Sequence, residues 1–285
     1  METDKYLITG AGSGFGKSMA FGLAKKGYDV IASVEVLSQV SVLKKEAEEK
    51  KIQLTVEKLD VTDPVDRERA GTWDVDVLVN NAGISEGGGV ADIPEKNLRN
   101  QFEVNVFGPI LLTQNFAKKM KTKGQGKIVF MSSVAGFSAN PLSGPYAASK
   151  FAIEAFAESL SKEMQEFNVQ VATINPGPYL TGFNDREFDR FKSWKDNPTE
   201  RLFDYEKINY ASEQYDPEEV TQPSIDVLTG KTNQYRNVIP EDMIPDQKEK
   251  QEEVWNRRTD NQLGKQHETI KKAYTIEKGK PATDA

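Results

Sequence analysis

Short apolar, β-branched runs alternate with longer amphipathic stretches through most of this chain. RNVI (236–239) is a candidate last strand, and six earlier runs have the length and composition of buried strands: KYLIT, DVIAS, QLTVEKL, VDVLV, KIVFMS and VQVATIN. Amphipathic helical stretches separate them, including long helices around Lys96–Lys121 and from about Pro145 to Phe167. This alternation predicts an α/β fold, a doubly wound parallel sheet of about seven strands with helices on both faces.

The alternation stops after the sixth strand. Residues 178–215 are rich in aromatic side chains, which predicts either a substrate-covering flap or the core of a helical insertion: Tyr179, Phe183, Phe188, Phe191, Trp194, Phe203, Tyr205 and Tyr210. Asp216 and Pro217 then signal a helix start, and Gly230 signals its end. In the segment 246–285, 17 of 40 residues are charged and the apolar positions keep no sustained helical period. We therefore expect one domain (1–245) with a charged C-terminal tail (246–285), partly disordered or packed as a helix on a partner.

Composition excludes several kinds of site. The 285 residues include 44 acidic and 37 basic side chains, a net charge of −7, no cysteine and one histidine, His267. Thiolate chemistry is thereby excluded, no metal site is expected, and the acidic balance argues against a nucleic-acid surface. The charged N-terminus METDKYLITG does not read as a secretory signal, and the longest uncharged stretch, Ile128–Ser149, is rich in Ser, Pro and Gly. We expect no membrane span and a cytoplasmic protein.

A glycine-rich loop follows the first strand and opens a helix. Its sequence is Thr9-Gly10-Ala11-Gly12-Ser13-Gly14-Phe15-Gly16, which fits TGxxxGxG and not the commoner GxGxxG. Glycines at this place let a phosphate approach the backbone N–H groups and the positive end of the helix. The loop therefore predicts a dinucleotide site, although a flexible turn would have the same composition.

Carboxylates end the next two strands. Glu35 lies about twenty residues beyond the glycines, where a carboxylate can accept hydrogen bonds from a ribose diol and repel a 2′-phosphate. Asp60-Val61 ends the third strand and can meet the adenine edge. Each has an ordinary alternative, because Glu35 also suits a helix start and Asp60 a turn.

Tyr146 and Lys150 are four residues apart in a helical stretch, so they share one face. A phenol with a pKa of about 10 needs a nearby cation to exchange protons at neutral pH. Ser133 ends the fifth strand thirteen residues before Tyr146 and offers a hydroxyl to a carbonyl oxygen. The spacing alone is weak, since Tyr and Lys often occur four apart by chance.

Together these residues resemble the short-chain dehydrogenase/reductase family in its simple single-domain form. Its motifs occur in the family's order and spacing over about residues 5 to 182: TGAGSGFG (9–16), Asp60-Val61, NNAG (80–83), Asn105, Ser133 in MSSVAG, YAASK (146–150) and PGPYLT (176–181). The resemblance implies a Rossmann-like fold and a nicotinamide cofactor.

The resemblance also implies roles for individual residues. Tyr146 would be the acid/base and Lys150 its partner, which also holds the nicotinamide ribose; Ser133 would orient the substrate oxygen. The Asn105 backbone would hold a water that relays protons to Lys150. The implied cofactor contacts are Gly10, Ser13, Gly14, Phe15, Gly16, Glu35, Asp60, Val61, Asn81, Ala82, Gly83, Tyr146, Lys150, Pro176, Gly177 and Thr181.

The chain departs from the family pattern at the end of the second strand. Val34 stands where the family often has the aspartate that selects NAD, and Glu35 stands at or near the arginine that selects NADP. The lack of a basic residue there favours NAD over NADP. The region between Asp60 and Asn80 is also short for the family, with VDRERAGTW as the remnant of a helix.

The sequence thus predicts an NAD(P)-dependent oxidoreductase that acts on a small-molecule secondary alcohol or ketone. One alternative is a dinucleotide-binding sensor or scaffold without turnover, which the set Asn105, Ser133, Tyr146 and Lys150 disfavours. Another is halide or epoxide conversion, which the glycine loop disfavours, as does Lys150, where that chemistry is associated with an arginine. The outer faces of the two long helices carry small and apolar residues such as Ala148, Phe151, Ala152 and Ala155, which favours a homodimer or homotetramer.

Overall fold

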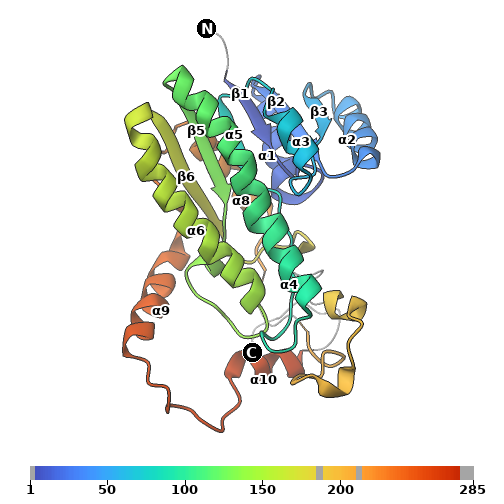
Figure 1. The fold of residues 1–285 in the computed structure, drawn as a ribbon, viewed down its shortest axis with the longest axis vertical. Helices are drawn as coiled ribbons and strands as arrows, with labels where there is room; N and C mark the ends of the chain where they lie inside the picture. The colour runs from blue at the N-terminus through green and yellow to red at the C-terminus, as the bar shows by residue number, and fades with distance from the viewer. Residues whose placement is uncertain (1–3, 184–188, 210–213, 277–285) are drawn as a thin grey trace.

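The predicted strands pair into one parallel sheet in the computed structural model of the chain, which describes residues 4–183, 189–209 and 214–276 (Figure 1). Its strands are β1 (Lys5–Ile8), β2 (Asp29–Val34), β3 (Thr55–Lys58), β4 (Val77–Asn80), β5 (Gly126–Met131), β6 (Val169–Pro176) and β7 (Arg236–Ile239). Their order across the sheet is β3-β2-β1-β4-β5-β6-β7, and neighbouring strands are parallel. The fold expected from the alternation, seven strands included, is confirmed.

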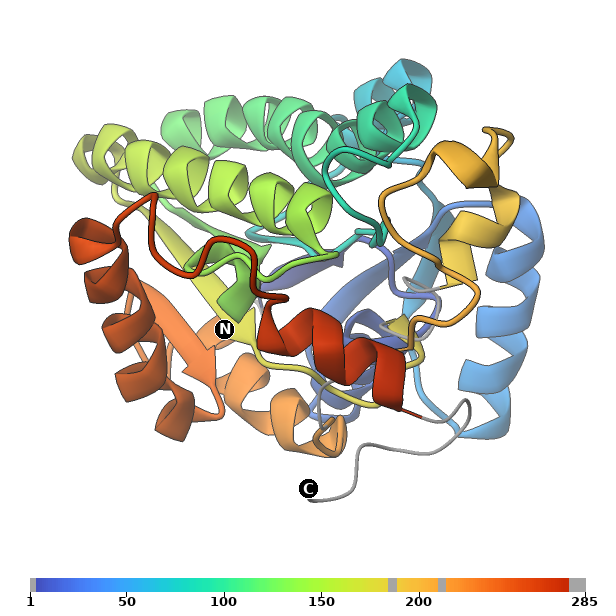
Figure 2. The same cartoon turned by 90° about the horizontal axis from the view of Figure 1, so that it is seen from below.

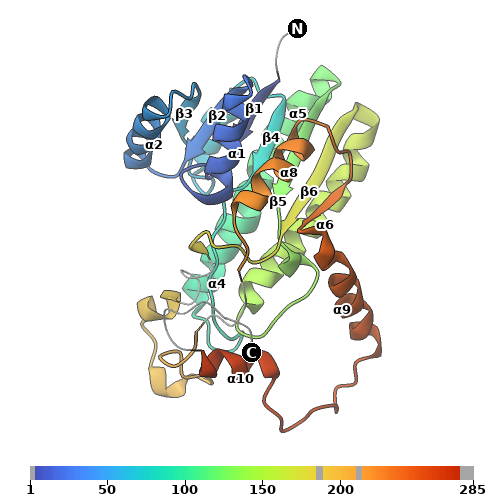
Figure 3. The same ribbon diagram turned by 180° about the vertical axis from the view of Figure 1, so that it is seen from behind.

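Helices cover both faces of this sheet. One face packs against α1 (Gly14–Lys25), α2 (Leu37–Glu49) and α8 (Glu218–Leu228), and Figure 3 shows α1 and α8 on this side. The opposite face packs against α3 (Pro64–Ala70), α5 (Gly108–Lys123) and α6 (Gly144–Met164). Each strand supplies both layers, because successive side chains point to opposite faces: Ile8 packs in the first core and Leu7 in the second.

The long helix predicted around residues 96–121 is interrupted. It consists of α4 (Glu95–Phe102), a π-helical turn (Glu103–Phe107) and α5. Pro109 lies in the first turn of α5 and has no N–H. The carbonyl of Asn105, four residues earlier, therefore lacks its ordinary α-helical donor. The interruption occurs at a residue to which the family resemblance assigns a backbone role.

A third apolar cluster lies beyond the carboxyl ends of the strands. It joins the loop before α6, the segment 191–208 and α10 (Glu268–Thr275), and it consists of Leu142, Phe191, Trp194, Tyr205, Ile208 and Ala273, with Ile93, Phe203 and Tyr274 packed against it. Figure 2, seen from below, shows α10 crossing this end of the molecule with the 190–205 segment to one side.

The segment 246–276 is more ordered than its composition suggested. It holds most of α9 (Ile244–Asn256) and all of α10, and α10 packs on this chain itself. The backbone N–H of Asn209 donates to the carbonyl of Ala273 (2.9 Å), and the N–H of Asp204 donates to the Tyr274 hydroxyl (3.0 Å). Ile270, Ala273 and Tyr274 form a helical stripe too short to register as a sustained period. In the described part of the chain, no helix has the length and apolar character needed to cross a bilayer.

Candidate active site

A cavity of about 750 Å³ runs along the carboxyl edge of the sheet. In a doubly wound sheet this edge is where ligands bind, next to the point at which the strand order reverses. The predicted cofactor residues that line the cavity are Gly10, Ser13, Gly14, Phe15, Gly16, Glu35, Asp60, Val61, Asn81, Ala82, Gly83, Tyr146, Lys150, Pro176, Gly177 and Thr181. Ser133 lines it too, so the loop and the proposed reaction centre share one continuous space.

The glycine loop has a conformation and packing that require glycine. Gly10 and Gly14 have φ values of 65° and 53°, in the left-handed region that side chains disfavour. A Cβ on Gly16 would lie 2.4 Å from Nδ2 of Asn81 and 2.6 Å from the Gly10 carbonyl oxygen. The side chain of Ser13 makes no capping hydrogen bond to α1. The first N–H groups of that helix therefore need another acceptor, which a phosphate can supply.

Thr9 ties this loop to the one after β4. Its hydroxyl accepts hydrogen bonds from the backbone N–H groups of Asn81 and Ala82, both at 3.0 Å. The Asn81 side chain donates in return to the Thr9 carbonyl at 2.8 Å. Hydrogen bonds thus join two loops that are 72 residues apart in sequence and that both line the cavity.

The end of the cavity beneath β2 and β3 carries negative charge. Glu35 is exposed and lines the cavity with Gln39, while the Asp60 carboxylate accepts the N–H (2.8 Å) and hydroxyl (2.7 Å) of Thr62. Two lysines of the adjoining elements pair with other carboxylates: Lys17 of α1 contacts Glu46 at 3.1 Å and Lys58 of β3 contacts Asp66 at 2.6 Å. Among the described residues 34–62 that line the cavity, none is a lysine or arginine.

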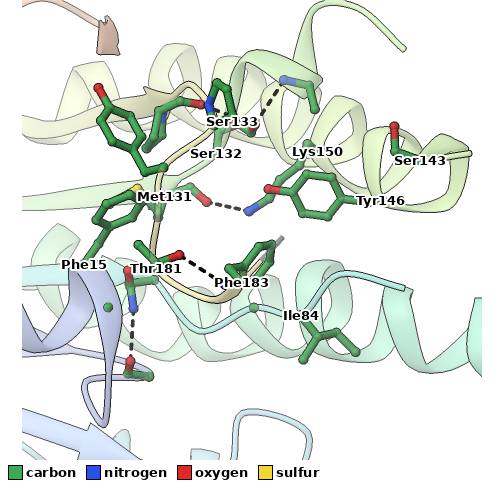
Figure 4. Close-up of a pocket in the computed structure, with 18 of the residues that line it drawn as sticks. Phe15, Ile84, Met131, Ser132, Ser133, Ser143, Tyr146, Lys150, Thr181 and Phe183 are labelled. Atoms are coloured by element: carbon green, nitrogen blue, oxygen red, sulfur yellow. Dashed lines mark hydrogen bonds between the residues drawn. The ribbon is translucent and has the colours of Figure 1, made fainter. Parts of the chain in front are cut away.

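Tyr146 and Lys150 extend from the first turns of α6 into the opposite part of the cavity (Figure 4). The Lys150 ammonium lies 5.6 Å from the centroid of the Tyr146 ring and donates to the carbonyl of Met131 at 2.8 Å. Lys150 is buried, and its burial lowers the pKa to about 8 although the nearby Glu154 carboxylate acts in the opposite direction. A cation held beside a phenol is the arrangement that stabilises a phenolate.

Ser133 follows β5 in an extended conformation and begins a short 3₁₀ turn. Its hydroxyl accepts the N–H of Ala135 at 3.1 Å and donates to the carbonyl of Pro176 at 3.4 Å. The second bond is long, so the hydroxyl proton can be redirected to a stronger acceptor in the cavity.

Glu154 anchors this part of the site from behind. It is one turn beyond Lys150 on α6, buried, and pairs with Arg236 of β7 at 3.0 Å. It also accepts from the Asn175 amide at 2.6 Å, and that amide contacts the Ser133 carbonyl at 3.3 Å. A single buried carboxylate therefore links α6, β6, β7 and the serine turn. Sequence reasoning missed it; its position four residues after Lys150, on the same helix face, was the available signal.

Asn105 is placed behind the cavity and not among its lining residues. Its side-chain oxygen accepts the Ile84 N–H at 2.8 Å, and its amide donates to the Ile84 carbonyl (2.9 Å) and the Ser149 hydroxyl (3.1 Å). These bonds hold the loop after β4 against α6, with the backbone of the π-helical turn beside them. Its side chain is thus committed to structure, which leaves only its backbone for the role that the resemblance implies.

The described aromatic residues of the segment 178–215 fall into two groups: some line the cavity, as expected of a substrate-covering flap, and others form an apolar core. Tyr179 and Phe183 line the cavity, and the Phe183 ring lies 5.7 Å from that of Tyr146 (Figure 4). The other described aromatics belong to the third cluster: Phe191, Trp194, Phe203 and Tyr205. Phe188 and Tyr210 lie outside the described residues.

Several lining residues come from segments that the motifs do not reach. The loop before α6, the 3₁₀ turns at Arg190 and before α9, and helices α9 and α10 contribute Asn140, Leu142, Arg190, Met243, Gln247, Lys250, Thr269 and Ala273. The predicted tail is therefore part of the cavity wall. The stripe Ile270, Ala273 and Tyr274 was the one local signal that a helix formed there.

Comparison with known proteins agrees with this geometry. A family model described as short chain dehydrogenase matches residues 5–191. The chain is 34% identical over 226 residues to the uncharacterized oxidoreductase YusZ of Bacillus subtilis, with 75% of this chain and 80% of that protein covered. It is 35% identical over 189 residues to the NADPH-dependent 3-dehydrocapnine reductase of Ornithobacterium rhinotracheale. That match covers 61% of this chain and 65% of the relative, just under two thirds of its length.

A solved structure has the same fold. The crystal structure of a short chain dehydrogenase/reductase from Burkholderia phymatum in complex with NAD superposes with a TM-score of 0.78 at 22% identity, covering 90% of this chain and 96% of that one. The match of the family model and the arrangement of the motif residues around one cavity lead to the same conclusion. The chain belongs to the short-chain dehydrogenase/reductase family.

Proposed function

We propose that this protein is an NAD(P)-dependent oxidoreductase that interconverts a secondary alcohol and the corresponding ketone. The observation that carries the proposal is the placement of Ser133, Tyr146 and Lys150 in the same cavity as the glycine loop. A sensor or scaffold would need the loop alone, whereas these three side chains have the chemistry of proton transfer to or from an oxygen.

The cavity fits a dinucleotide. The phosphates would lie over Gly10–Gly16, the adenosine ribose near Glu35 and the nicotinamide near Thr181 and Tyr146, all of which line the cavity. The start of α1, which has no side-chain cap, supports the phosphate site. Gly16 packs so closely against Asn81 and Gly10 that no side chain fits there. When bound, the nicotinamide supplies or accepts the hydride.

The residues of this chain handle the proton. Ser133 donates a hydrogen bond to the substrate oxygen, and the Tyr146 hydroxyl gives that oxygen its proton in reduction or removes it in oxidation. The Lys150 ammonium stabilises the resulting phenolate. The carbonyl of Asn105, which Pro109 leaves without its helical donor, would hold a water that relays protons to Lys150. Tyr179 and Phe183, the described aromatics of the 178–215 segment that line the cavity, would exclude bulk water.

Tyr146→Phe tests the proposal. This change removes one hydroxyl and leaves the ring packing against Phe183, so cofactor affinity should persist while kcat falls about a hundredfold or more. The measurements are calorimetric titration with NADH and NADPH and a carbonyl-reduction assay. Full turnover in the variant would refute the assignment of Tyr146, and failure of both cofactors to bind the wild type would refute the redox function itself.

We also propose that NAD is the preferred cofactor. The support is the exposed Glu35 and the lack of a lysine or arginine among the described lining residues 34–62. In parallel titrations at one salt concentration, NADH should bind more tightly than NADPH, and Glu35→Arg should shift the ratio toward NADPH by about tenfold or more. An unaltered ratio would return Glu35 to the role of an ordinary helix-start residue.

A homodimer or homotetramer is the proposed assembly. Large apolar side chains are exposed along the outer side of the π-helical turn, α5 and α6: Phe107 (49%), Leu111 (40%), Phe151 (43%) and Phe156 (46%). Exposed large apolar side chains on two helices in contact are typical of a protein–protein interface. Light scattering after size exclusion should give a multiple of 31.8 kDa, and Phe151→Glu should lower it.

A further inference from the structure

We propose that Arg190 forms an anion-binding subsite, so that the substrate carries a carboxylate, phosphate or similar anionic group besides its reacting carbonyl or hydroxyl. This inference rests on the proposed oxidoreductase function and names the class of its substrate.

Arg190 begins the 3₁₀ turn Arg190–Ser193 and lines the cavity. The next residue, Phe191, is buried, belongs to the third cluster together with Leu142, and stacks on Tyr205 at 5.6 Å. The backbone at Leu142 in turn accepts the N–H of Gly88 at 2.7 Å. The turn that begins at Arg190 is thus anchored over the loop after β4 and the loop between β5 and α6, and α6 is the helix that carries Tyr146.

The Arg190 guanidinium lines the cavity with no partner among the described residues. Its Nε is shielded from solvent and lacks a hydrogen-bond acceptor. Three other cations of the segment 189–208 are paired, Lys192 with Asp189, Arg201 with Asp196 at 2.6 Å and Lys207 with Asp204 at 2.7 Å, and Lys195 is exposed to solvent. Arg190 is half-buried, and its shielded Nε–H has neither an acceptor among the described residues nor access to water, which is unfavourable until an anion in the cavity accepts from it.

The charges of the surrounding wall point the same way. Among the described residues that line the cavity, only Glu35 and Asp60 carry carboxylates, and both follow strands at the adenosine end. The substrate end has Arg190, Lys150 and Lys250 instead, and Lys250 is already paired with Asp246 at 2.7 Å. In a chain with a net charge of −7, this end selects for negative ligands. A guanidinium can hold a carboxylate or phosphate through two parallel hydrogen bonds.

The test uses pairs of carbonyl compounds in which one member carries an anionic group and the other a neutral counterpart. The pairs are acetoacetate, levulinate and oxodecanoate, each against its methyl ester, and dihydroxyacetone phosphate against dihydroxyacetone. Calorimetry measures their binding to the full chain saturated with NADH or NADPH, and a reduction assay gives kcat/KM. The wild type should bind at least one anion about tenfold or more tightly than its neutral partner, and Arg190→Gln should abolish that preference. Lys192→Gln, which removes a paired cation of the same turn, should retain it.

Three results would overturn the subsite: no anion preference for any pair in the wild type, an unchanged preference in Arg190→Gln, or a loss of cofactor affinity in Arg190→Gln. The last would mean that the guanidinium serves the dinucleotide phosphates. The pair that responds distinguishes a carboxylate from a phosphate. Failure of the proposed oxidoreductase function would give another result. The wild type would still bind anions preferentially, but it would reduce no carbonyl compound, charged or neutral.

Discussion

Burial of the Lys150 ammonium should make the folded protein more stable as the pH rises above about 8. The side chain is 6% exposed, and burial lowers its pKa from 10.5 to about 8. At roughly 1.4 kcal/mol for each pKa unit, the charged form is disfavoured in the folded state by about 3 kcal/mol. Lys150→Met removes that penalty, and at pH 7 it also leaves the Met131 carbonyl without the hydrogen bond that the ammonium donates.

The direction of this pH dependence follows from the protonation of Lys150 in the folded and the unfolded state. Below pH 8 the lysine is protonated in both the folded and the unfolded chain, so the penalty is fully present. Between about pH 8 and 10.5 the unfolded chain keeps the proton and the folded protein has lost it, and raising the pH therefore favours folding. Relative to Lys150→Met, the wild type should gain about 3 kcal/mol of unfolding free energy across this interval.

Urea unfolding of the ligand-free wild type and Lys150→Met at several pH values from 7 to above 10 measures this gain, since the difference between the two proteins cancels the other titrating groups. Lys162→Met is the control, because Lys162 is a 72% exposed lysine of the same helix. A difference between wild type and Lys150→Met that stays flat with pH would refute the reasoning. It would mean that the ammonium is solvated, and the proposed stabilisation of a Tyr146 phenolate in a dry pocket would lose its basis.

Two further substitutions test the supports of the site. Gly16→Ala places a Cβ against Asn81 and the Gly10 carbonyl, so we expect a loss of about 1–3 kcal/mol in unfolding free energy and weaker cofactor binding. Gly12→Ala, whose Cβ would make an ordinary 3.5 Å contact, is the matched control for stability, and equal losses in both would contradict the packing argument. Glu154→Gln removes the carboxylate that raises the pKa of Lys150, so the alkaline limb of the pH profile of kcat/KM should move to lower pH. An unmoved limb would reduce Glu154 to a structural role.

The sheet and the motifs were predictable because their signals are local. A strand buried on both faces reads as an apolar run, a glycine loop must directly follow β1, and Tyr146 and Lys150 need only one helical turn between them. Once the strands are parallel, all their carboxyl ends lie on one edge. Glu35, Asp60, Asn81, Ser133 and Pro176 then meet around one cavity by topology.

Other features depend on contacts between segments far apart in sequence, and no local pattern encodes those. The pattern around 96–121 predicted the two ends of the helical stretch correctly. The π-helical turn within it depends on packing, because Asn105 bonds both to the loop after β4 and to α6. The eight residues of α10 gain their order from packing on the third cluster, 65 or more residues earlier in the chain.

By itself, the amino-acid sequence determined the sheet, the position of the dinucleotide loop and the identity of the proposed proton-transfer residues, because helical and strand periods and short motif spacings specify these without distant partners. Only the tertiary structure decided which groups surround them. Burial depends on everything packed around a side chain, so the low pKa of Lys150, its coupling to Glu154 and the unmatched charge of Arg190 at the far wall appear only when the chain is folded.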